Sequence, residues 1–567
     1  MGELKLGNEF GTPSQDDWLQ AVEAALRGKA ADTLTCNDLA GFSRHPLYTE
    51  GNSATADNPA GMPGFAPFTR GAKPLNSKFL PWHIAQRVII GRKAADNDAI
   101  LTDLAGGVSA LTLDFSESDA NIKTLDALLK GVMLDIAPLS LANASAENAQ
   151  TVLALLDKHE IGDVPLFLNL TADDAAALSD IATTRPSARL MTANGAAFHA
   201  QGAGVPQELG WMLAELAEGL RALEATGIDA PEALSKITLT VAADVDFFAT
   251  LAKIRAARVL FANIAAAIGA PDTQPQIYAE TGLRAFSDID PWVNILRATS
   301  AAGIAGVDML TIAPCTATSA IDNTLTRRIA RNTQVILQEE SHIGHVADAA
   351  GGSWYIESLT TQLAEAAWAE FQKIEAAGGI NQAQAHIDAA LTEARAAFDA
   401  AIDSRAMPLV GVSEFPNLEE APLATGSDNG YRLSAAYEAL RNAAQKAKPK
   451  VFLATIGEMA SYTPRANFAA NIYAAGGLHA VSGEGGTDAQ AIAEAFKKST
   501  AKIAVICAGD EDYEAHAHEV AAALKAAGAT HIALTGKPRD NSDIDAYCFT
   551  GCATLSFLQD IHKKLGL

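Results

Sequence analysis

The feature that most constrains this chain is a repeated alternation of short apolar runs and helical segments between residues 93 and 380. Apolar runs of this length predict buried strands, and the helical periodicity between them predicts covering helices. Eight runs are predicted as strands: VSALTLDF, VMLDIAP, VPLFLNL, RLMTANGAA, ITLTVAAD, PQIYAET, DMLTIAP and, most weakly, HVADAA. Eight strand–helix repeats in about 290 residues predict a closed (β/α)8 TIM barrel, which we place at residues 81–380.

A second alternation follows at residues 449–567, where VFLATI, LHAVSG, KIAVICAG, HIALTG and AYCFTG each precede a helix or turn. Five such units predict a flavodoxin-like doubly wound domain. The intervening residues 381–448 are an Ala-rich helix, the loop SEFPNLEEAPLATGSDNG and another helix, which together predict a helical linker.

Residues 1–80 contain one early helix, DDWLQAVEAALRG, and then the Pro/Gly-rich stretch NSATADNPAGMPGFAPFTRG. Such a long irregular segment is typical of an arm that lies on another surface. We therefore predict that residues 1–80 form an N-terminal arm and an entrance segment, and that the arm contacts a partner chain.

The charge balance narrows the possible functions. The formal net charge is −25 at pH 7, and an excess this acidic repels nucleic-acid phosphates and anionic lipids. The apolar run VLFANIAAAIGAP at residues 259–271 is too short to cross a bilayer. The start of the chain, MGELKLGNEF, carries charges where a signal peptide needs an apolar core. We predict a cytoplasmic protein with no nucleic-acid or membrane partner.

The cysteines and histidines show no metal-binding pattern. The five cysteines lack the spacing of a disulfide framework or a zinc site, so reduced thiols are expected. His516 and His518 are two residues apart in a predicted helix and therefore point to different sides. We predict no metal site in this chain.

One long motif indicates a family. The stretch RIARNTQVILQEESHIGHVADAAGGSWYIESLT, residues 328–360, closely resembles a signature of the acyl-CoA mutases that use adenosylcobalamin. PGFAPFTRG, followed by Pro81 and Trp82, looks like the thioester-binding entrance segment of that family. AAFHAQGAGVPQELGWMLA and FFATLAKIRAARVLFA also resemble it. The similarity covers residues 60–567 and includes the order of the two domains, and methylmalonyl-CoA mutase is the nearest named member.

The resemblance places a cobalamin site in the turn GEMASYTPRANFAANIYAAGG, residues 457–477. Family members carry Asp-x-His-x-x-Gly there: the His ligates cobalt, the Asp orients the imidazole, and the Gly allows close approach. Here Ser461, Thr463 and Ala466 stand at those three positions, and a threonine hydroxyl cannot replace an imidazole as a cobalt ligand. Other cofactor positions of the family correspond to Cys507, Gly509, Gly536 and Lys537. The resemblance thus implies that this chain binds no cobalamin.

The barrel also departs from the family pattern. Family members clamp coenzyme A with Tyr and Arg side chains at positions that here hold Lys73, Leu80, His83, Ala85 and Arg87. Leu80 and Ala85 replace two guanidiniums and cannot pair with phosphate, and Arg87 replaces the active-site Tyr. Only His199, in FHAQGAG, matches an active-site residue of the family. A lone histidine is more often part of the core than catalytic.

A retained scaffold with two altered sites resembles the small (beta) subunit of heterodimeric methylmalonyl-CoA mutase. The resemblance implies a non-catalytic chain without a cofactor. Its partner would be a large (alpha) subunit that holds adenosylcobalamin and interconverts methylmalonyl-CoA and succinyl-CoA by a radical rearrangement of the carbon skeleton. Two alternatives remain open: a divergent, independently active mutase, and a regulatory module that binds a ligand in the barrel cavity.

Overall fold

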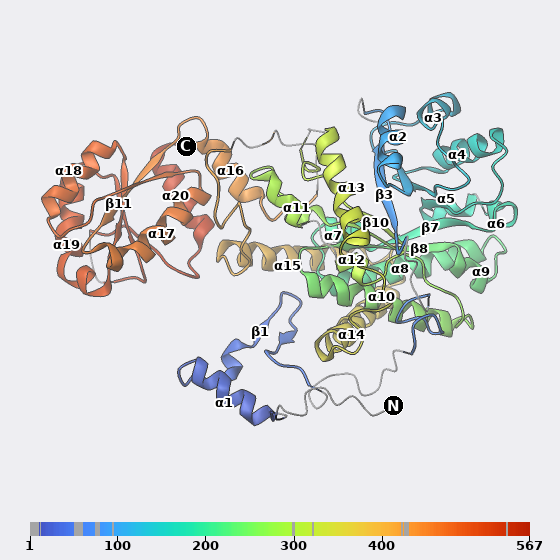
Figure 1. The fold of residues 1–567 in the computed structure, drawn as a ribbon, viewed down its shortest axis with the longest axis horizontal. Helices are drawn as coiled ribbons and strands as arrows, with labels where there is room; N and C mark the ends of the chain where they lie inside the picture. The colour runs from blue at the N-terminus through green and yellow to red at the C-terminus, as the bar shows by residue number, and fades with distance from the viewer. Residues whose placement is uncertain are drawn as a thin grey trace.

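The structure is a computed structural model, and Figure 1 shows its two lobes and its N-terminal extension. It describes residues 11, 13–49, 61–73, 80–92, 96–177, 179–297, 301–319, 323–420, 423, 430–539 and 543–567. The larger lobe is a barrel surrounded by helices, and the smaller lobe contains the end of the chain. Helices α15 (Gln384–Asp403) and α16 (Ala435–Ala444) lie between the two lobes.

Eight parallel strands close into the barrel, in the order β10-β3-β4-β5-β6-β7-β8-β9. They are β3 (His83–Ile89), β4 (Ala110–Asp114), β5 (Leu139–Ala142), β6 (Leu166–Leu170), β7 (Ala188–Asn194), β8 (Ile237–Ala243), β9 (Ile277–Thr281) and β10 (Met309–Thr311). The barrel closes where β10 pairs with both β3 and β9. The closed parallel barrel agrees with the predicted TIM barrel.

Two of the eight predicted strands are wrong. VMLDIAP, residues 132–138, forms turns in which Met133 and Ile136 are exposed, and the strand is the following segment β5. HVADAA, residues 345–350, is also a turn region, because its Asp348 forms ion pairs with Arg70 and Arg255. The missing strand is β3, which lies within the predicted barrel but was not among the predicted strands; His83, Ala85 and Arg87 were expected there only as altered coenzyme A positions. Gln86 and Arg87 interrupt its apolar run. Arg87 lies two positions after the inward-facing Ala85 and therefore faces the barrel interior, where polar side chains are accepted.

The helices of the barrel lobe fall into two groups by length. The longer ones are α8 (Val205–Glu224), α10 (Phe247–Ala267), α13 (Thr324–Glu339) and α14 (Trp354–Ala376). The shorter ones are α2 (Asn97–Ala105), α3 (Ile122–Leu128), α4 (Ala146–Lys158), α5 (Ala172–Ala177), α6 (Ile181–Thr184), α7 (Gly195–Ala200), α9 (Ala230–Ser235), α11 (Asn294–Arg297) and α12 (Ala301–Ile304), with the 3-10 turns η3 (Leu283–Ala285) and η4 (Pro291–Val293). Helix α14 packs against both α8 and α10. This packing supports the side of the barrel that carries β7 and β8.

The barrel interior is filled at the level where the strands begin. Ala85, Ala110, Phe167, Tyr278 and Met309 form a separate buried cluster there. The rings of Phe167 and Tyr278 meet edge to face, with centroids 4.8 Å apart. These side chains close the axis of the barrel, so open space is left at its C-terminal end.

The smaller lobe holds a five-stranded parallel sheet in the order β12-β11-β13-β14-β15. Its strands are β11 (Lys450–Thr455), β12 (His479–Ser482), β13 (Ile503–Cys507), β14 (His531–Thr535) and β15 (Ala546–Cys548), and each lies where a strand was predicted. Helices α17 (Met459–Ala475), α18 (Ala489–Ser499), α19 (Asp510–Ala526) and α20 (Thr554–Leu565) cover it. Because side chains alternate along a strand, Val451 and Leu453 pack with α17 and α20, whereas Phe452 and Ala454 pack with α18 and α19.

The N-terminal extension begins with α1 (Gln15–Ala25) and continues through the 3-10 turn η1 (Ala31–Leu34) to the short strands β1 (Cys36–Asn37) and β2 (Ser43–Arg44). Helix α1 buries none of its residues and stands away from the lobes in Figure 1. The extension is attached to the barrel lobe by an Arg44–Asp246 ion pair of 2.8 Å. Residues 1–10, 12, 50–60 and 74–79 of the predicted arm and entrance segment lie outside the described residues. None of the described helices has the length and apolarity needed to cross a membrane.

Candidate functional site

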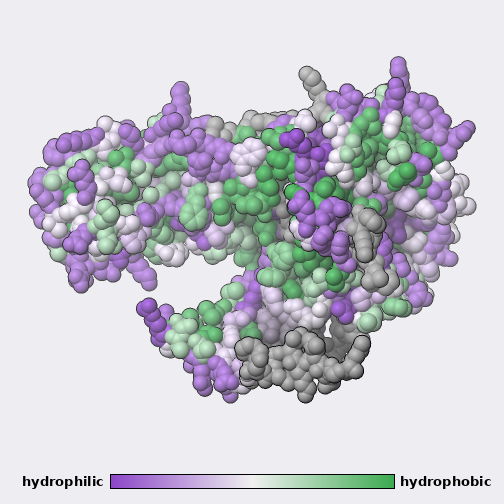
Figure 2. Space-filling view, viewed as in Figure 1, coloured by the Kyte–Doolittle hydropathy of each residue, from purple (hydrophilic) through white to green (hydrophobic). Residues whose placement is uncertain are grey.

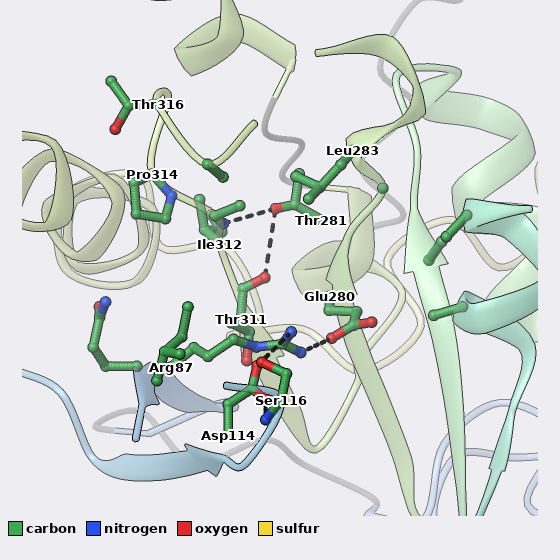
Figure 3. A pocket seen from close by; sticks show the side chains of 18 of the residues that line it. Arg87, Asp114, Ser116, Glu280, Thr281, Leu283, Thr311, Ile312, Pro314 and Thr316 are labelled. Carbon is green, nitrogen blue, oxygen red and sulfur yellow. Dashed lines mark hydrogen bonds and ion pairs between the residues drawn. The ribbon is translucent and has the colours of Figure 1, made fainter. Parts of the chain in front are cut away.

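A cavity of about 810 Å³ opens at the C-terminal ends of the barrel strands. This end of a TIM barrel is where its loops build binding and catalytic sites. Strands β3, β4, β8, β9 and β10 contribute to the wall, together with α7 and the loops that follow β4, β9 and β10. Figure 3 shows that charged side chains gather on one side of this cavity and small or apolar ones on the other.

Arg87 is at the centre of the charged side. Its guanidinium lies 3.4 Å from Asp114 and forms a second ion pair with Glu280, as Figure 3 shows. Asp114 also accepts hydrogen bonds from the Asn143 side chain at 2.8 Å and the Ser116 backbone at 2.9 Å. The Glu280 carboxylate, more than that of Asp114, raises the pKa of Arg87. The guanidinium therefore remains charged and bound to two carboxylates.

The other arginines of the cavity wall also have carboxylate partners. Arg92 donates to Glu117 through Nε at 2.8 Å, and Arg327 donates to the buried Asp103 at 2.7 Å. Sequence reasoning found Arg87 but missed Asp114, Glu117 and Glu280. The available signal was their position, since each acid ends a barrel strand or closely follows one.

The opposite side of the cavity is apolar and rigidly held. Leu283, Ile312 and Pro314 line it, with Ile89 and several alanines around them. The Thr281 hydroxyl accepts from the Ala313 backbone at 3.1 Å and donates to the Thr311 carbonyl at 3.4 Å. These bonds fix the loop after β10 against the end of β9, so this wall is preformed.

His199, the residual family match, lies at this cavity. It is 1% exposed, with Nδ1 3.4 Å from Glu208 and Nε2 3.7 Å from Asp244. Among the described residues neither ring nitrogen has a hydrogen-bond partner of adequate geometry. Burial, followed by the nearby Arg284, lowers the pKa of His199. A Cβ at position 282 would lie 2.6 Å from Nε2, so Gly282 is what lets the ring lie so close to the cavity wall.

A buried charged network supports this histidine from behind. Lys253 and Glu208 are both fully buried and lie 2.8 Å apart, and Glu208 also accepts from the Ala242 backbone at 2.9 Å. Asp244 forms an ion pair with Arg284. Burial alone would raise the pKa of Asp244, but the positive charge of Arg284 overcomes this effect and lowers it. The network holds His199 in place and keeps its charged neighbours paired.

The remaining barrel positions from the sequence analysis do not gather at this cavity. Ala85 belongs to the buried cluster that closes the barrel axis. His83 starts β3 and lies 3.3 Å from the Ser109 hydroxyl, at the N-terminal end of the barrel. Lys73 is exposed, and Leu80 precedes β3. The structure therefore brings Arg87 and His199 to one cavity and leaves the other four outside it.

The predicted cofactor positions of the smaller lobe lie in and around α17. Ser461 and Thr463 are in the first turns of this helix, and Ala466 is buried in the core beneath it. The Ser461 hydroxyl donates to Asp512 at 2.9 Å, and the Thr463 hydroxyl donates to the Met459 carbonyl at 2.5 Å. Both hydroxyls therefore donate their hydrogen bonds to groups of this chain and do not point freely into the space above the sheet.

The other four cofactor positions lie around β13 and β14. Cys507 is fully buried, and burial raises the pKa of its thiol to about 12. A Cβ at Gly509 would lie 2.3 Å from the Ser461 hydroxyl oxygen. The Gly536 backbone donates to the Cys548 carbonyl at 2.9 Å, and Lys537 is exposed. No group of three His, Cys, Asp or Glu residues in the described ranges could hold a metal ion.

Bonds between loops close this edge of the sheet. The backbones of Gly457 and Gly486 donate to each other's carbonyls at 3.0 Å. Arg465 donates to the Ala508 carbonyl at 2.6 Å and to Asp510 at 2.9 Å, and its guanidinium lies over the Tyr513 ring, 4.8 Å from the centroid. The turns that would hold a ligand in a doubly wound fold are bonded to one another.

Comparison with known proteins gives a consistent result. The profile of one protein family, methylmalonyl-CoA mutase, matches residues 37–154 and 171–494. The methylmalonyl-CoA mutase small subunit of Streptomyces virginiae is 37% identical, across 100% of this chain and 98% of that protein. The small subunit of Propionibacterium freudenreichii subsp. shermanii is 33% identical, across 100% and 97%. A protein named methylmalonyl-CoA mutase from Cereibacter sphaeroides is 29% identical, across 73% of this chain and 66% of its own length.

Proposed function

Because the chain belongs to the methylmalonyl-CoA mutase family, we propose that it is the non-catalytic small subunit of a cytoplasmic heterodimeric mutase. Its partner is a large subunit that binds adenosylcobalamin and interconverts methylmalonyl-CoA and succinyl-CoA by a radical rearrangement of the carbon skeleton. The observation that carries the proposal is the full-length similarity to two proteins named small subunits.

The smaller lobe supports the absence of a cofactor in this chain. We propose that its sheet is a degenerate flavodoxin-like domain of the cobalamin-binding type. Its residues do not fit a corrin: Thr463 offers a hydroxyl that is already bonded to a backbone carbonyl, and the space beside Gly509 is taken up by Ser461. A neutral hydroxyl is a poor cobalt ligand.

The barrel supports the absence of catalysis. Arg87 is paired with two carboxylates, so it is not available for a substrate phosphate. Phe167 and Tyr278 fill the barrel axis, where an extended thioester would have to pass to reach the cavity from the other end. Ala85 lies in the same buried cluster and provides no cation.

Two surfaces of this chain are suited to contact a partner chain. Helix α1 stands away from the lobes with Trp18, Val22 and Leu26 only partly covered. Figure 2 shows an apolar area between the lobes, over the region of α11 and α16. Exposed apolar residues of this part of the chain include Trp292, Leu296, Val410 and Phe415. Exposed apolar area of this kind marks interaction sites, and a permanent complex is expected to bury on the order of 2,000 Å² or more.

Co-expression with a large subunit that retains Asp-x-His-x-x-Gly tests the proposal. We expect a stable 1:1 complex on size-exclusion chromatography, with mutase activity that survives substitutions at Arg87 and His199. Equilibrium dialysis of the small subunit alone should show no stoichiometric binding of adenosylcobalamin. Cofactor binding by the single chain would instead support a divergent mutase, and failure of the full-length chains to associate would refute the subunit role.

Removing residues 1–45 tests whether the N-terminal arm holds the two subunits together. We expect weaker assembly with little change in the thermal unfolding of the barrel lobe, because α1 buries none of its residues in this chain. Substitution of the exposed Met133 by Ser, in the turns before β5, is the control and should leave assembly unchanged. An unchanged complex after the deletion would show that the arm does not hold the two subunits together.

A further inference from the structure

Four large apolar side chains are exposed together between the lobes, on two segments that are far apart in the sequence. Trp292 and Leu296, from η4 and α11, are 49% and 83% exposed, and Val410 and Phe415, from the linker, are 50% and 78% exposed. We call these four residues the linker patch. Trp292 and Leu296 are four positions apart on consecutive helical turns and therefore point to the same side. Figure 2 shows an apolar area in this region, between the two lobes.

Polar bonds lock the two segments together, so the linker patch is preformed. Arg297 donates to the Val410 carbonyl at 2.5 Å, and the Asn417 backbone donates to Asp290 at 2.9 Å. A Cβ at position 411 would lie 2.9 Å from that of Asp290, which shows how closely the linker loop meets η4. A surface that is fixed in advance loses little conformational entropy when a partner binds to it.

Phe415 is held in an unfavourable backbone conformation. Its φ is +50°, and a left-handed backbone is rare for a bulky aromatic residue, so it persists only where surrounding bonds hold it. The Phe415 backbone donates to the Asn471 side chain at 2.7 Å, and Asn471 in turn donates to Glu414 at 2.6 Å. Glu414 also forms an ion pair with Arg405. The loop thus holds a large aromatic ring in solvent at a cost in backbone free energy, as expected of a side chain that anchors a partner.

The charges around the linker patch decide which partner fits it. Residues 290–297 and 409–420 carry four carboxylates, Asp290, Glu414, Glu419 and Glu420, and one cation, Arg297. Arg297 is buried, whereas Glu419 is exposed and the Glu414 side chain is 26% exposed. The rim of the patch is therefore acidic, and the net charge of the whole chain is −25. A second copy would bring the same acidic rim and the same net charge, which opposes association.

We propose that the linker patch is a docking site for the large subunit, with Leu296 and Phe415 as its main anchors. The surface that fits it is apolar at its centre and carries arginine or lysine at its edge, opposite Glu414 and Glu419. The identity of this partner rests on the proposed function, whereas the position and chemistry of the contact come from this chain alone.

Surface plasmon resonance between the full-length chain and a large subunit that retains Asp-x-His-x-x-Gly measures this contact. Leu296→Ser and Phe415→Asn should each raise the Kd by about thirtyfold or more, the loss typical of an anchor residue. The matched control, Ile136→Ser, removes an apolar side chain that is 66% exposed on the barrel lobe and should leave the Kd within about twofold. Unchanged Kd values for both patch variants, with the wild-type chains still associating, would refute the docking site and leave the subunit role intact. No association of the wild-type chains would refute both.

Phe415→Asn also separates binding from folding. Asparagine adopts a left-handed backbone more readily than phenylalanine does, and the ring that it replaces is mostly exposed in the isolated chain. The midpoint of thermal unfolding of the isolated chain should therefore not fall. A clear fall would show that the ring stabilises the loop of this chain, and would overturn its role as an anchor for a partner.

Charge reversal at Glu419 tests the acidic rim. Glu419→Lys should slow association with the large subunit by about tenfold at low salt and by much less at high salt, because salt screens exposed charges. The control Glu224→Lys changes the net charge equally at an exposed position near the end of α8 and should slow association far less. Equal effects of the two reversals would refute a local acidic rim. In sedimentation equilibrium the small subunit alone should be monomeric, and self-association that Leu296→Ser abolishes would assign the patch to a second copy instead.

Discussion

The barrel and the smaller sheet differ in how their loops are arranged at the C-terminal ends of the strands. Both present the C-terminal ends of parallel strands, where their fold classes hold ligands. The barrel keeps a cavity of about 810 Å³ there. At the smaller sheet, reciprocal bonds between Gly457 and Gly486 and the Ser461–Asp512 bond join the loops to one another.

The difference shows what keeps such a site open. In the barrel, inward-facing charges such as Arg87, Asp114 and Glu280 need polar surroundings, and the buried Glu208–Lys253 pair holds the wall behind them. In the smaller sheet, small residues let neighbouring loops approach until their backbones bond. The charged wall of the barrel thus stays open at the strand ends, whereas small residues at the strand ends of the smaller sheet allow its loops to bond to one another.

The largest expected loss of stability comes from breaking the buried Lys253–Glu208 ion pair behind the cavity wall. Lys253→Ala leaves Glu208 buried without its cation, and loss of one partner of a buried pair costs about 3–5 kcal/mol. Urea unfolding followed by tryptophan fluorescence should show this loss, since Trp211 lies in α8 with Glu208. The double variant Lys253→Met with Glu208→Gln should lose less, because no charge is left unpaired. A loss below 1 kcal/mol in the single variant would mean that the pair does not support the cavity wall.

Next in size is a pH effect at Glu215, which bonds the Asn194 backbone at 2.6 Å where α7 begins. Burial raises the pKa of Glu215 to about 7, above its ordinary value near 4.5. The folded state therefore holds this proton more tightly than the unfolded chain does, so stability falls as pH rises from about 4.5 to 7 and then levels off.

Glu215→Gln removes that loss while keeping an oxygen for the Asn194 backbone. We expect a gain of about 2–3 kcal/mol at pH 8 and almost none at pH 4.5, after allowing for partial exposure of the side chain. Denaturant titrations at the two pH values measure it. Equal effects at both would show that Glu215 is not protonated in the folded barrel.

The smallest expected loss of stability concerns the edge of the smaller sheet where the Gly457 and Gly486 loops bond to each other. Gly457 has φ +86°, and a Cβ there would lie 2.3 Å from the Asp512 carboxylate. Gly457→Ala should cost about 2 kcal/mol, from the left-handed backbone and from the weakened Ser461–Asp512 bond. Gly528, with φ +99° and open space around it, is the matched control and should cost about 1 kcal/mol. Equal losses in thermal unfolding would indicate that the loop contact contributes nothing.

The sequence by itself determined the order of the elements. Alternating apolar runs predicted six of the eight barrel strands and all five strands of the smaller sheet, because buried parallel strands need nearly continuous apolar residues. It failed at β3, where Arg87 interrupts the run, and at VMLDIAP, where Met133 and Ile136 are apolar but exposed. Local composition cannot show whether a polar residue faces into a barrel or an apolar residue faces outward.

Only the tertiary structure decided what the sites contain. Arg87, Asp114 and Glu280 are up to 193 positions apart in sequence, and closure of the barrel brings them together. His199 was found from its motif, but its burial and its close approach to Gly282 depend on how α7 meets the end of β9. Hydrogen bonds and charge pairs act over a few ångströms, so their partners are set by the folded arrangement rather than by neighbours along the chain.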